Sequence, residues 1–249
     1  MDFIGIIPAR YHSVRFLGKP LVDLAGKSMI LRTYEQVIKV KKFADVVVAT
    51  DDERIYNEIV SSGGKAIMTA NTHTSGTERA AEAFIKLNYE QKNTVIVNIQ
   101  GDEPFIKPQQ IEELIDCFDN PNTKIATLIK KINNEEMLHN SHVVKAVISD
   151  TGKALYFSRS AIPFLRDKSF TDTVFYKHIG IYAYKSEVLN EIIKLPSSSL
   201  EEAESLEQLR WLQAGYEIQT YTTHYEDTIG IDTMHDVEKA LLYIKNNNL

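Results

Sequence analysis

Apolar runs alternate with helical patterns along the first half of the chain. The runs at 3–7, 44–49 and 95–99 are short, continuous and rich in β-branched residues, as strands buried on both faces usually are. Between them, residues 28–41 and 53–61 carry apolar side chains at helical spacing. Helices that connect parallel strands produce this alternation, so we predict an α/β fold with a mostly parallel sheet and flanking helices.

The second half of the chain contains more strand-like segments and fewer helical crossovers. Strands are predicted at 125–129, 143–148, 154–157, 176–184 and 218–222, the second and third forming a hairpin. A long amphipathic helix is predicted at 200–213 and a last helix at 234–246. Because no linker separates two domains, we expect a single domain over residues 1–249 with a small β-rich insertion at about 143–184.

Composition narrows the classes of function. The chain has 249 residues, 43% of them hydrophobic, which is enough to bury a full core. Its 28 basic and 34 acidic residues give a net charge of −6, which argues against a protein that coats nucleic acid. The single cysteine, Cys117, is expected to be a buried apolar residue. Without an apolar run of about 18 residues or a signal-like start, we expect a soluble cytoplasmic protein.

Three cations follow the first predicted strand. Pro8 lacks an N–H donor and is expected to end that strand. Arg10, Arg15 and Lys19 then lie at its carboxyl end, where open α/β sheets bind ligands. Two guanidinium groups and an ammonium suit the oxygens of a triphosphate, although a solvated basic loop would have the same spacing. The dinucleotide-binding pattern G-x-G-x-x-G is absent from this loop.

Two further segments lead to the same predicted edge of the sheet. Ser75 or Thr77 is expected to cap a helix and to leave N–H groups facing an anion, with Arg79 close by. Capping alone is the alternative interpretation of this segment. Asp102 follows the strand at 95–99 and a glycine, a position that suits a hard metal ion shared with phosphates. A helix-capping role is the alternative for Asp102.

A second polar group lies far along the chain. Arg159, Lys177, His178 and Tyr182 offer a fork-shaped cation, an ammonium, an imidazole and a hydroxyl. Such a set suits an anionic substrate that carries hydroxyl groups. The alternative is that the tyrosines of this segment form one face of a half-buried strand.

Seven blocks of residues follow one another from Phe3 to about Glu238. They are Ile7-Pro8-Ala9-Arg10 with Ser13, Arg15 and Gly18-Lys19-Pro20, then Ser75-Gly76-Thr77-Glu78-Arg79, Gln100-Gly101-Asp102-Glu103-Pro104, Tyr156-Phe157-Ser158-Arg159, His178-Ile179-Gly180-Ile181-Tyr182, Leu206-Glu207-Gln208-Leu209-Arg210 and Gly230-Ile231-Asp232-Thr233. In these blocks the chain resembles the 3-deoxy-manno-octulosonate cytidylyltransferases. The resemblance implies a nucleotide-diphospho-sugar transferase type of fold. It also implies a nucleotidyltransferase that converts CTP and 3-deoxy-manno-octulosonate (Kdo) to CMP-Kdo and pyrophosphate for lipopolysaccharide synthesis.

The resemblance implies roles for individual residues. The nucleotide-binding residues are expected to be Ala9, Arg10, Ser13, Arg15, Lys19, Ser75, Arg79 and Gln100. The sugar-binding residues are expected to be Gln100, Arg159, His178, Tyr182, Glu207 and Gln208. Mg²⁺ is the implied cofactor with Asp102 and Asp232 as its ligands, and the implied catalytic residues are Arg10, Lys19, Asp102 and Asp232. A homodimer with part of its surface at 159–184 is implied, and neither nucleic acid nor a membrane is an expected partner.

Three positions depart from the family pattern. Leu17 and Ser199 stand where proline is usual, and Ser141-His142 replaces a common Pro-Asn pair. These changes affect loop stiffness rather than charge, so they leave the expected reaction unchanged. The 8-amino analogue of Kdo and sialic acid are alternative substrates. A glycosyltransferase is less well supported because no Asp-x-Asp follows the strand at 95–99, and a nucleotide-binding regulator would not need two separated acids and a second polar group.

Overall fold

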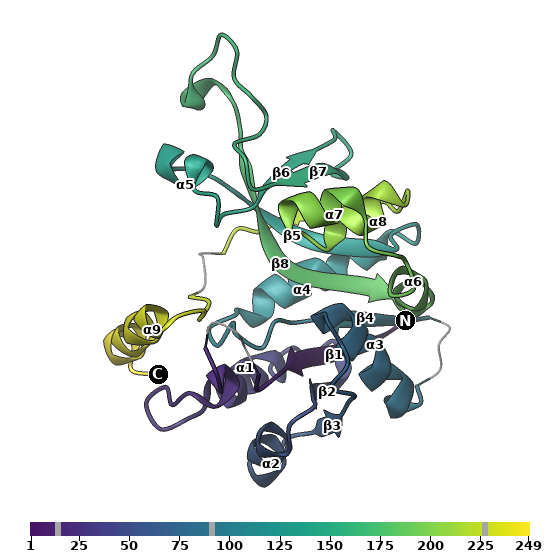
Figure 1. The fold of residues 1–249 in the computed structure, drawn as a ribbon, viewed down its shortest axis with the longest axis vertical. Helices are drawn as coiled ribbons and strands as arrows, with labels where there is room; N and C mark the ends of the chain where they lie inside the picture. The colour runs from purple at the N-terminus through teal and green to yellow at the C-terminus, as the bar shows by residue number, and fades with distance from the viewer. Residues whose placement is uncertain (13–15, 90–92, 226–228) are drawn as a thin grey trace. The chain divides into compact units, whose positions relative to one another are not determined.

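The chain divides into two compact units. The computed structural model describes residues 1–12, 16–89, 93–225 and 229–249 (Figure 1). The first unit comprises Met1–Glu112 and Tyr225–Leu249, and the second comprises Glu113–His224. The predicted insertion at about 143–184 therefore lies inside the second unit. No helix in the described part of the chain is long and apolar enough to cross a membrane.

The first unit contains a parallel sheet with the strand order β3-β2-β1-β4. Its strands are β1 (Asp2–Ala9), β2 (Phe43–Thr50), β3 (Ala66–Met68) and β4 (Thr94–Asn98). Its helices are η1 (Lys19–Leu21), α1 (Met29–Val37), α2 (Glu53–Ser61), α3 (Gly76–Leu87) and α9 (Met234–Asn247), and α4 (Pro108–Asp116) begins in it. The alternation of strands and helices confirms the predicted α/β class.

Side-chain caps set the first turn of several helices in this unit. The Ser28 hydroxyl accepts the N–H of Leu31 at 3.3 Å and so caps the start of α1. Asp52 caps α2 in the same way, and Thr233 caps α9. Each cap satisfies an N–H group that the helix itself leaves unpaired.

β1 continues through Pro8, so the prediction that proline ends this strand is wrong. Pro8 lies beside Ala49 of β2, and β1 ends one residue later. The carbonyl of Ile6 accepts the N–H of Ile99 at 3.0 Å, so Pro8, two residues on, faces the same side of β1. On that side the register with β4 ends at Asn98. The missing N–H of Pro8 therefore costs no hydrogen bond of the sheet.

The second unit contains a mixed group of strands. Its strands are β5 (Ile125–Lys131), β6 (Lys145–Ile148), β7 (Ala154–Ser158), β8 (Tyr176–Lys185) and β9 (Ile218–Thr222). β5 pairs antiparallel with β8 and parallel with β9, and β6 pairs antiparallel with both β7 and β8. The predicted hairpin is thus confirmed as β6 and β7. The helices of this unit are η2 (Cys117–Asp119), α5 (Glu135–His139), η3 (Phe170–Asp172), α6 (Ser186–Ile192), α7 (Ser199–Glu204) and α8 (Gln208–Gln213).

The long helix predicted at 200–213 is wrong, because two short helices, α7 and α8, occupy this segment. Ser205 separates them with left-handed backbone angles of φ 52° and ψ 51°. In a continuous helix the Glu204 carbonyl would accept an N–H four residues later. Here it accepts the Nε–H of Arg159 at 2.8 Å instead. A contact from a distant part of the sequence therefore overrides a helical pattern.

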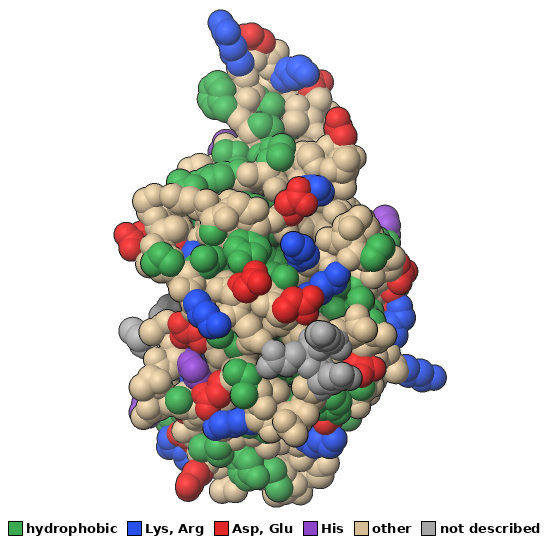
Figure 2. Space-filling view, turned by 90° about the vertical axis from the view of Figure 1, so that its right-hand side faces the viewer, with side chains coloured by type: hydrophobic (Ala, Val, Ile, Leu, Met, Phe, Trp, Pro, Cys, Tyr) green, Lys and Arg blue, Asp and Glu red, His purple; other side chains and the backbone are tan. Residues whose placement is uncertain are grey.

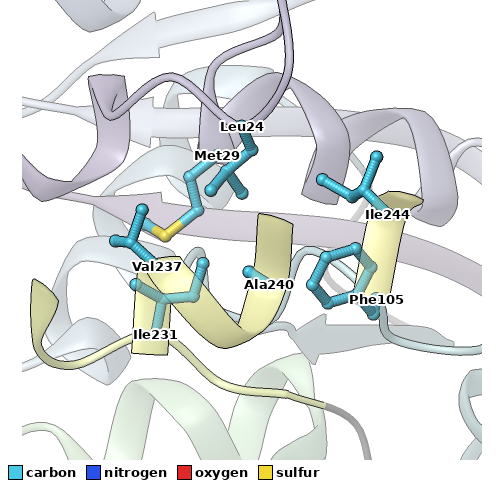
Figure 3. Packing of buried hydrophobic residues seen from close by; sticks show 7 residues of the cluster. All are labelled: Leu24, Met29, Phe105, Ile231, Val237, Ala240 and Ile244. Atoms are coloured by element: carbon cyan, nitrogen blue, oxygen red, sulfur yellow. The ribbon is translucent and has the colours of Figure 1, made fainter. Parts of the chain in front are cut away.

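Helix α9 packs against the rest of the first unit through a compact apolar cluster. Figure 3 shows its members, which come from the segments around η1 and α1, from the loop after β4, from the segment before α9 and from α9 itself: Leu24, Met29, Phe105, Ile231, Val237, Ala240 and Ile244. Each of these side chains is at least nine-tenths buried. Burial of so much apolar surface fixes α9, and with it the segment that carries Asp232.

Surface charges are mixed on the face shown in Figure 2. Basic and acidic side chains are interspersed there, and neither kind forms a continuous charged patch. With the net charge of −6, that face offers little attraction to a nucleic-acid backbone.

Candidate active site

A cavity in the first unit lies at the carboxyl ends of β1 and β4. Its lining includes all eight described residues of this unit that were predicted for the site: Ala9, Arg10, Lys19, Ser75, Arg79, Gln100, Asp102 and Asp232. Ser13 and Arg15, also predicted to bind the nucleotide, lie outside the described residues. Residues from five separate parts of the sequence thus converge on one cavity.

Lys19 lies between two carboxylates in this cavity. Its Nζ atom is 2.8 Å from Asp102 Oδ2 and 3.1 Å from Asp232 Oδ1. Burial lowers the pKa of Lys19, but the two carboxylates outweigh this effect, and the pKa is raised above its ordinary value of 10.5. Lys19 is therefore protonated at neutral pH, and its positive charge is shared by the two acids.

The backbone holds the two acids together. The N–H of Ile231 donates to the carbonyl of Asp102 at 3.0 Å, which joins the segments that carry the two side chains. Gly101 permits the close approach of this segment to β1, because a Cβ atom there would come within 2.9 Å of the Pro8 carbonyl oxygen. Asp102 and Asp232, which the resemblance implies as metal ligands, therefore lie on two segments that are joined directly.

The acid pair has the chemistry that Mg²⁺ requires. The donors are carboxylate oxygens, and the side chains of Asp102 and Asp232 are 34% and 49% exposed, which leaves room for other ligands. They already bracket one positive charge, the Lys19 ammonium. Among the described residues, no group of three or more His, Cys, Asp or Glu side chains forms a closed metal site. Mg²⁺ at this pair would take its other ligands from water and phosphate, as it commonly does.

The amino end of α3 forms another wall of the cavity. Ser75 caps the helix and accepts the N–H of Glu78 at 3.2 Å, so the capping interpretation of this segment is confirmed. Arg79 is 3% exposed and lines the cavity, where it donates to Asp51 at 3.2 Å and to Thr69 at 2.6 Å. The same helix end is therefore capped and also presents a cation and a helix dipole to the cavity.

His73 also lines the cavity, although the sequence did not identify it as a site residue. Its Nε2 atom makes a short contact with the Glu82 carboxylate. Burial alone would raise the pKa of Glu82, but Lys86, the Ala70 amide and His73 lower it to about 2. His73 and Glu82 are nine residues apart, and their contact depends on how the chain enters α3. Spacing in the sequence therefore gave no signal for it.

In the second unit, the guanidinium of Arg159 binds the backbone. It donates to the carbonyls of Glu204 at 2.8 Å, Ser141 at 3.2 Å and Ser205 at 3.4 Å. A guanidinium has five N–H groups, so two have no partner among the residues that the structure describes. Arg159 thus has a structural role that was not predicted, and its role in binding the sugar stays a prediction.

His178 is neutral at physiological pH. Although some of its surface is exposed, burial lowers its pKa to about 3. Its Nε2 atom lies 3.1 Å from the hydroxyl of Thr127, which itself donates to the Ile181 carbonyl at 2.8 Å. Because the hydroxyl has one hydrogen, it accepts from His178, and the imidazole proton lies on Nε2. Nδ1 is then a hydrogen-bond acceptor.

The other predicted sugar-binding residues are largely buried in the second unit. Tyr182 is 7% exposed and its ring packs edge-on against Trp211, so the half-buried-strand interpretation of β8 also holds. Gln208 is 5% exposed, and its Nε2 atom has no hydrogen-bond partner among the described residues. An unpaired buried donor typically costs about 1–3 kcal/mol, and a bound ligand or water would remove that cost. Glu207 accepts from Arg210 at 2.8 Å.

Comparison with known proteins reveals similarity over the whole chain. A family model described as cytidylyltransferase matches residues 4–220. A 3-deoxy-manno-octulosonate cytidylyltransferase of Parabacteroides distasonis is 53% identical over 99% of both chains, and one of Bacteroides thetaiotaomicron is 50% identical over 100% of both. A solved structure of CMP:2-keto-3-deoxy-manno-octonic acid synthetase, complexed with CTP, is 41% identical, with a TM-score of 0.92 over 99% of this chain and 100% of that one. A 4-diphosphocytidyl-2C-methyl-D-erythritol synthase of Anaerococcus prevotii, 14% identical over 98% and 99% of the two chains with a TM-score of 0.64, shares the fold.

Proposed function

Because this chain belongs to the 3-deoxy-manno-octulosonate cytidylyltransferase family, we propose that it transfers CMP from CTP to the anomeric hydroxyl of Kdo and releases pyrophosphate. The observation that carries the proposal is the cavity of the first unit. Eight predicted residues meet there around Lys19, Asp102 and Asp232. CMP-Kdo would serve lipopolysaccharide synthesis, and the need for CTP together with one buried free cysteine favours a cytoplasmic location.

The cavity has the groups that a triphosphate requires. Arg10, Lys19 and Arg79 bring three cations to its walls, and the amino end of α3 adds a positive dipole. They would bind the phosphate oxygens and hold the α-phosphorus in line for attack, so that catalysis rests on positioning and charge neutralisation. Mg²⁺ held by Asp102 and Asp232 would neutralise phosphate charge and make a bound hydroxyl easier to deprotonate.

The polar groups of the second unit suit the sugar acid. Arg159 has two N–H groups without a partner in the described part of the chain, which suit a carboxylate, and neutral His178 offers Nδ1 as an acceptor for a hydroxyl. Gln208 contributes a buried donor without a partner among the residues that the structure describes. Together with Tyr182 and Glu207, these groups match a substrate that carries one carboxylate and several hydroxyls.

We also propose that the protein is a homodimer through the region 159–184. Phe164 is 85% exposed and Val174 is 49% exposed in this region. They flank a small apolar cluster in which Phe170 stacks on Phe175 with ring centres 5.7 Å apart. Exposed apolar side chains beside such a cluster are typical of surfaces that another chain covers.

Pyrophosphate release tests the reaction. With CTP and Kdo we expect rapid release and a new cytidine-containing product, and with UTP or ATP much slower release, because a site that hydrogen-bonds a base discriminates against bases that leave its groups unpaired. The 8-amino analogue of Kdo and sialic acid belong in the same panel, because the residues do not separate them from Kdo. Equal turnover of the three nucleotides, or none with any sugar acid, would contradict the proposal.

A further inference from the structure

Lys145 is a buried cation that the proposed reaction does not use. It begins β6 and has no exposed surface. Its ammonium donates to three backbone carbonyls, those of Asn140 at 3.0 Å, Val143 at 2.6 Å and Arg159 at a still shorter distance. Three donors on one ammonium match three carbonyl acceptors, so the hydrogen-bonding capacity of the group is filled.

This arrangement is costly for the fold. Burial lowers the pKa of Lys145 from its ordinary value of 10.5, the neighbouring charge of Arg159 acts in the same direction, and Glu204 opposes them. The carboxylate of Glu204 meanwhile binds the hydroxyl of Ser158 at 2.5 Å and the N–H of Arg159 at 2.8 Å. An apolar residue at position 145 would avoid the desolvation penalty but would leave the three carbonyls without their donor, so the ammonium is retained for the backbone segments that it joins.

The three carbonyls belong to two separate segments of the chain, and Lys145 joins these segments. Asn140 and Val143 flank the short loop between α5 and β6, and Arg159 follows directly after β7. The guanidinium of Arg159 reaches back to the same loop, where it donates to the Ser141 carbonyl at 3.2 Å. Lys145 therefore fixes the main chain of Arg159 to the loop that the Arg159 side chain also contacts.

We propose that Lys145 is a positioning residue for the sugar acid. It sets the backbone of Arg159 so that the two guanidinium N–H groups that have no partner among the described residues meet the substrate carboxylate. This inference rests on the proposed function, in which Arg159 binds that carboxylate. A neutral residue at position 145 would leave three buried carbonyls without a donor. The Arg159 backbone would then shift to satisfy its carbonyl elsewhere, and the guanidinium would move with it.

Steady-state kinetics of Lys145→Met test the proposal. Methionine is similar in length to lysine but has no charge and no donor. We expect the KM for Kdo to rise about tenfold or more, with the KM for CTP within about twofold of the wild-type value, because a small displacement of a binding group has large effects. Lys153→Met is the matched control, since Lys153 lies in the same unit but forms an exposed ion pair with Glu217. An unchanged KM for Kdo, or an equal rise in both KM values, would overturn the proposal.

A double-variant cycle separates positioning from a general loss of order. If Lys145 acts through Arg159, then Lys145→Met combined with Arg159→Ala should use Kdo about as poorly as Arg159→Ala alone. Multiplicative losses would show that Lys145 acts independently. Lys145→Gln, which keeps two N–H donors, replaces Lys145→Met if the latter does not fold, and failure of both to fold would make Lys145 a purely structural residue. A wild-type enzyme without turnover of Kdo would instead contradict the proposed function.

Discussion

Lys19 occupies the position between two acids where a metal ion is also expected. Its ammonium neutralises the repulsion between Asp102 and Asp232 in the structure. When a nucleotide binds, the phosphates offer the ammonium new partners, and Mg²⁺ would then find both carboxylates already in place. The charge of Lys19 and the charge of the metal ion are thus expected to act in succession on the same pair of acids.

We therefore expect Asp102→Asn and Asp232→Asn each to lower kcat by about 100-fold or more, since each would remove half of the proposed metal site. The double variant should be little worse than either single one, because residues that act as a unit are not additive. The measurement is pyrophosphate release over a range of Mg²⁺ concentrations. Asp23→Asn is the control, because Asp23 accepts an exposed backbone N–H that asparagine can also accept. Near wild-type turnover in one single variant would remove that acid from the site.

The neutral state of His178 has a consequence for stability. Its folded pKa of about 3 lies below its ordinary value of 6.5, so between these values the unfolded chain binds a proton that the folded chain does not. Stability should therefore fall as the pH is lowered from 7 to 5, and His178 should account for about 2 kcal/mol of that loss. His178→Gln keeps a donor for Thr127. Between pH 7 and pH 5 its free energy of unfolding, measured with urea, should fall by about 2 kcal/mol less than that of the wild-type protein. Equal losses in both proteins would show that His178 is protonated in the folded state.

At the scale of the residue, side-chain chemistry predicted most of the first site. The cations after β1 and Asp102 after β4 were identified because each type of residue suits phosphate or metal at the edge of a sheet, whereas Asp232 before α9 was identified only through the family resemblance. His73 was missed because its contact with Glu82 depends on tertiary placement. The contacts of Arg159 with the carbonyls of Glu204 and Ser205 were missed for the same reason, since they join positions 45 and 46 residues apart in the sequence.

At the scale of the element, Ser205 occupies an unusual conformation between α7 and α8. Its left-handed backbone strains any residue with a Cβ atom, usually by about 1 kcal/mol. Ser205→Gly should therefore stabilise the protein by up to about 1 kcal/mol, and Ser205→Val should destabilise it by at least as much.

Urea unfolding measures both effects, and Ser199→Gly is the matched control. Ser199 lies in the right-handed first turn of α7, where glycine is expected to be destabilising. The same substitution should thus have opposite signs at the two serines. Destabilisation by Ser205→Gly would show that the hydroxyl, not the backbone, decides stability at this position.

The spacing of apolar residues predicted those helices and strands whose tertiary contacts agree with the preference of their own sequence. The alternation of the first unit, the caps at Ser28 and Ser75 and the hairpin of β6 and β7 all follow from local rules. The two errors, at the end of β1 and in the helix predicted at 200–213, arose where a distant part of the chain decides the local structure. Pro8 continues β1 because β4 has ended beside it, and the helix at 200–213 breaks because Arg159 takes a carbonyl of that helix.

At the scale of the whole molecule, the proposed homodimer can be tested through its exposed aromatic side chain. We expect the wild-type protein to have twice the mass of the 28.3 kDa chain in light scattering, and Phe164→Asp to have the mass of one chain, because a charge would be buried without a partner. Leu242→Asp is the control, since Leu242 is 60% exposed on α9, outside the region 159–184. A Phe164→Asp protein with the wild-type mass would exclude this surface as the main contact.

The discontinuity of the first unit has a consequence for synthesis of the protein on the ribosome. Lys19 and Asp102 emerge early, but Asp232 and α9 emerge only after the whole second unit, residues 113–224, has been made. Until then, the nascent first unit lacks one of its acids, and the apolar side chains that α9 covers, Leu24, Met29 and Phe105, face water. A growing chain is thus expected to hold a CTP cavity without a complete acid pair, and to depend on chaperones in that interval.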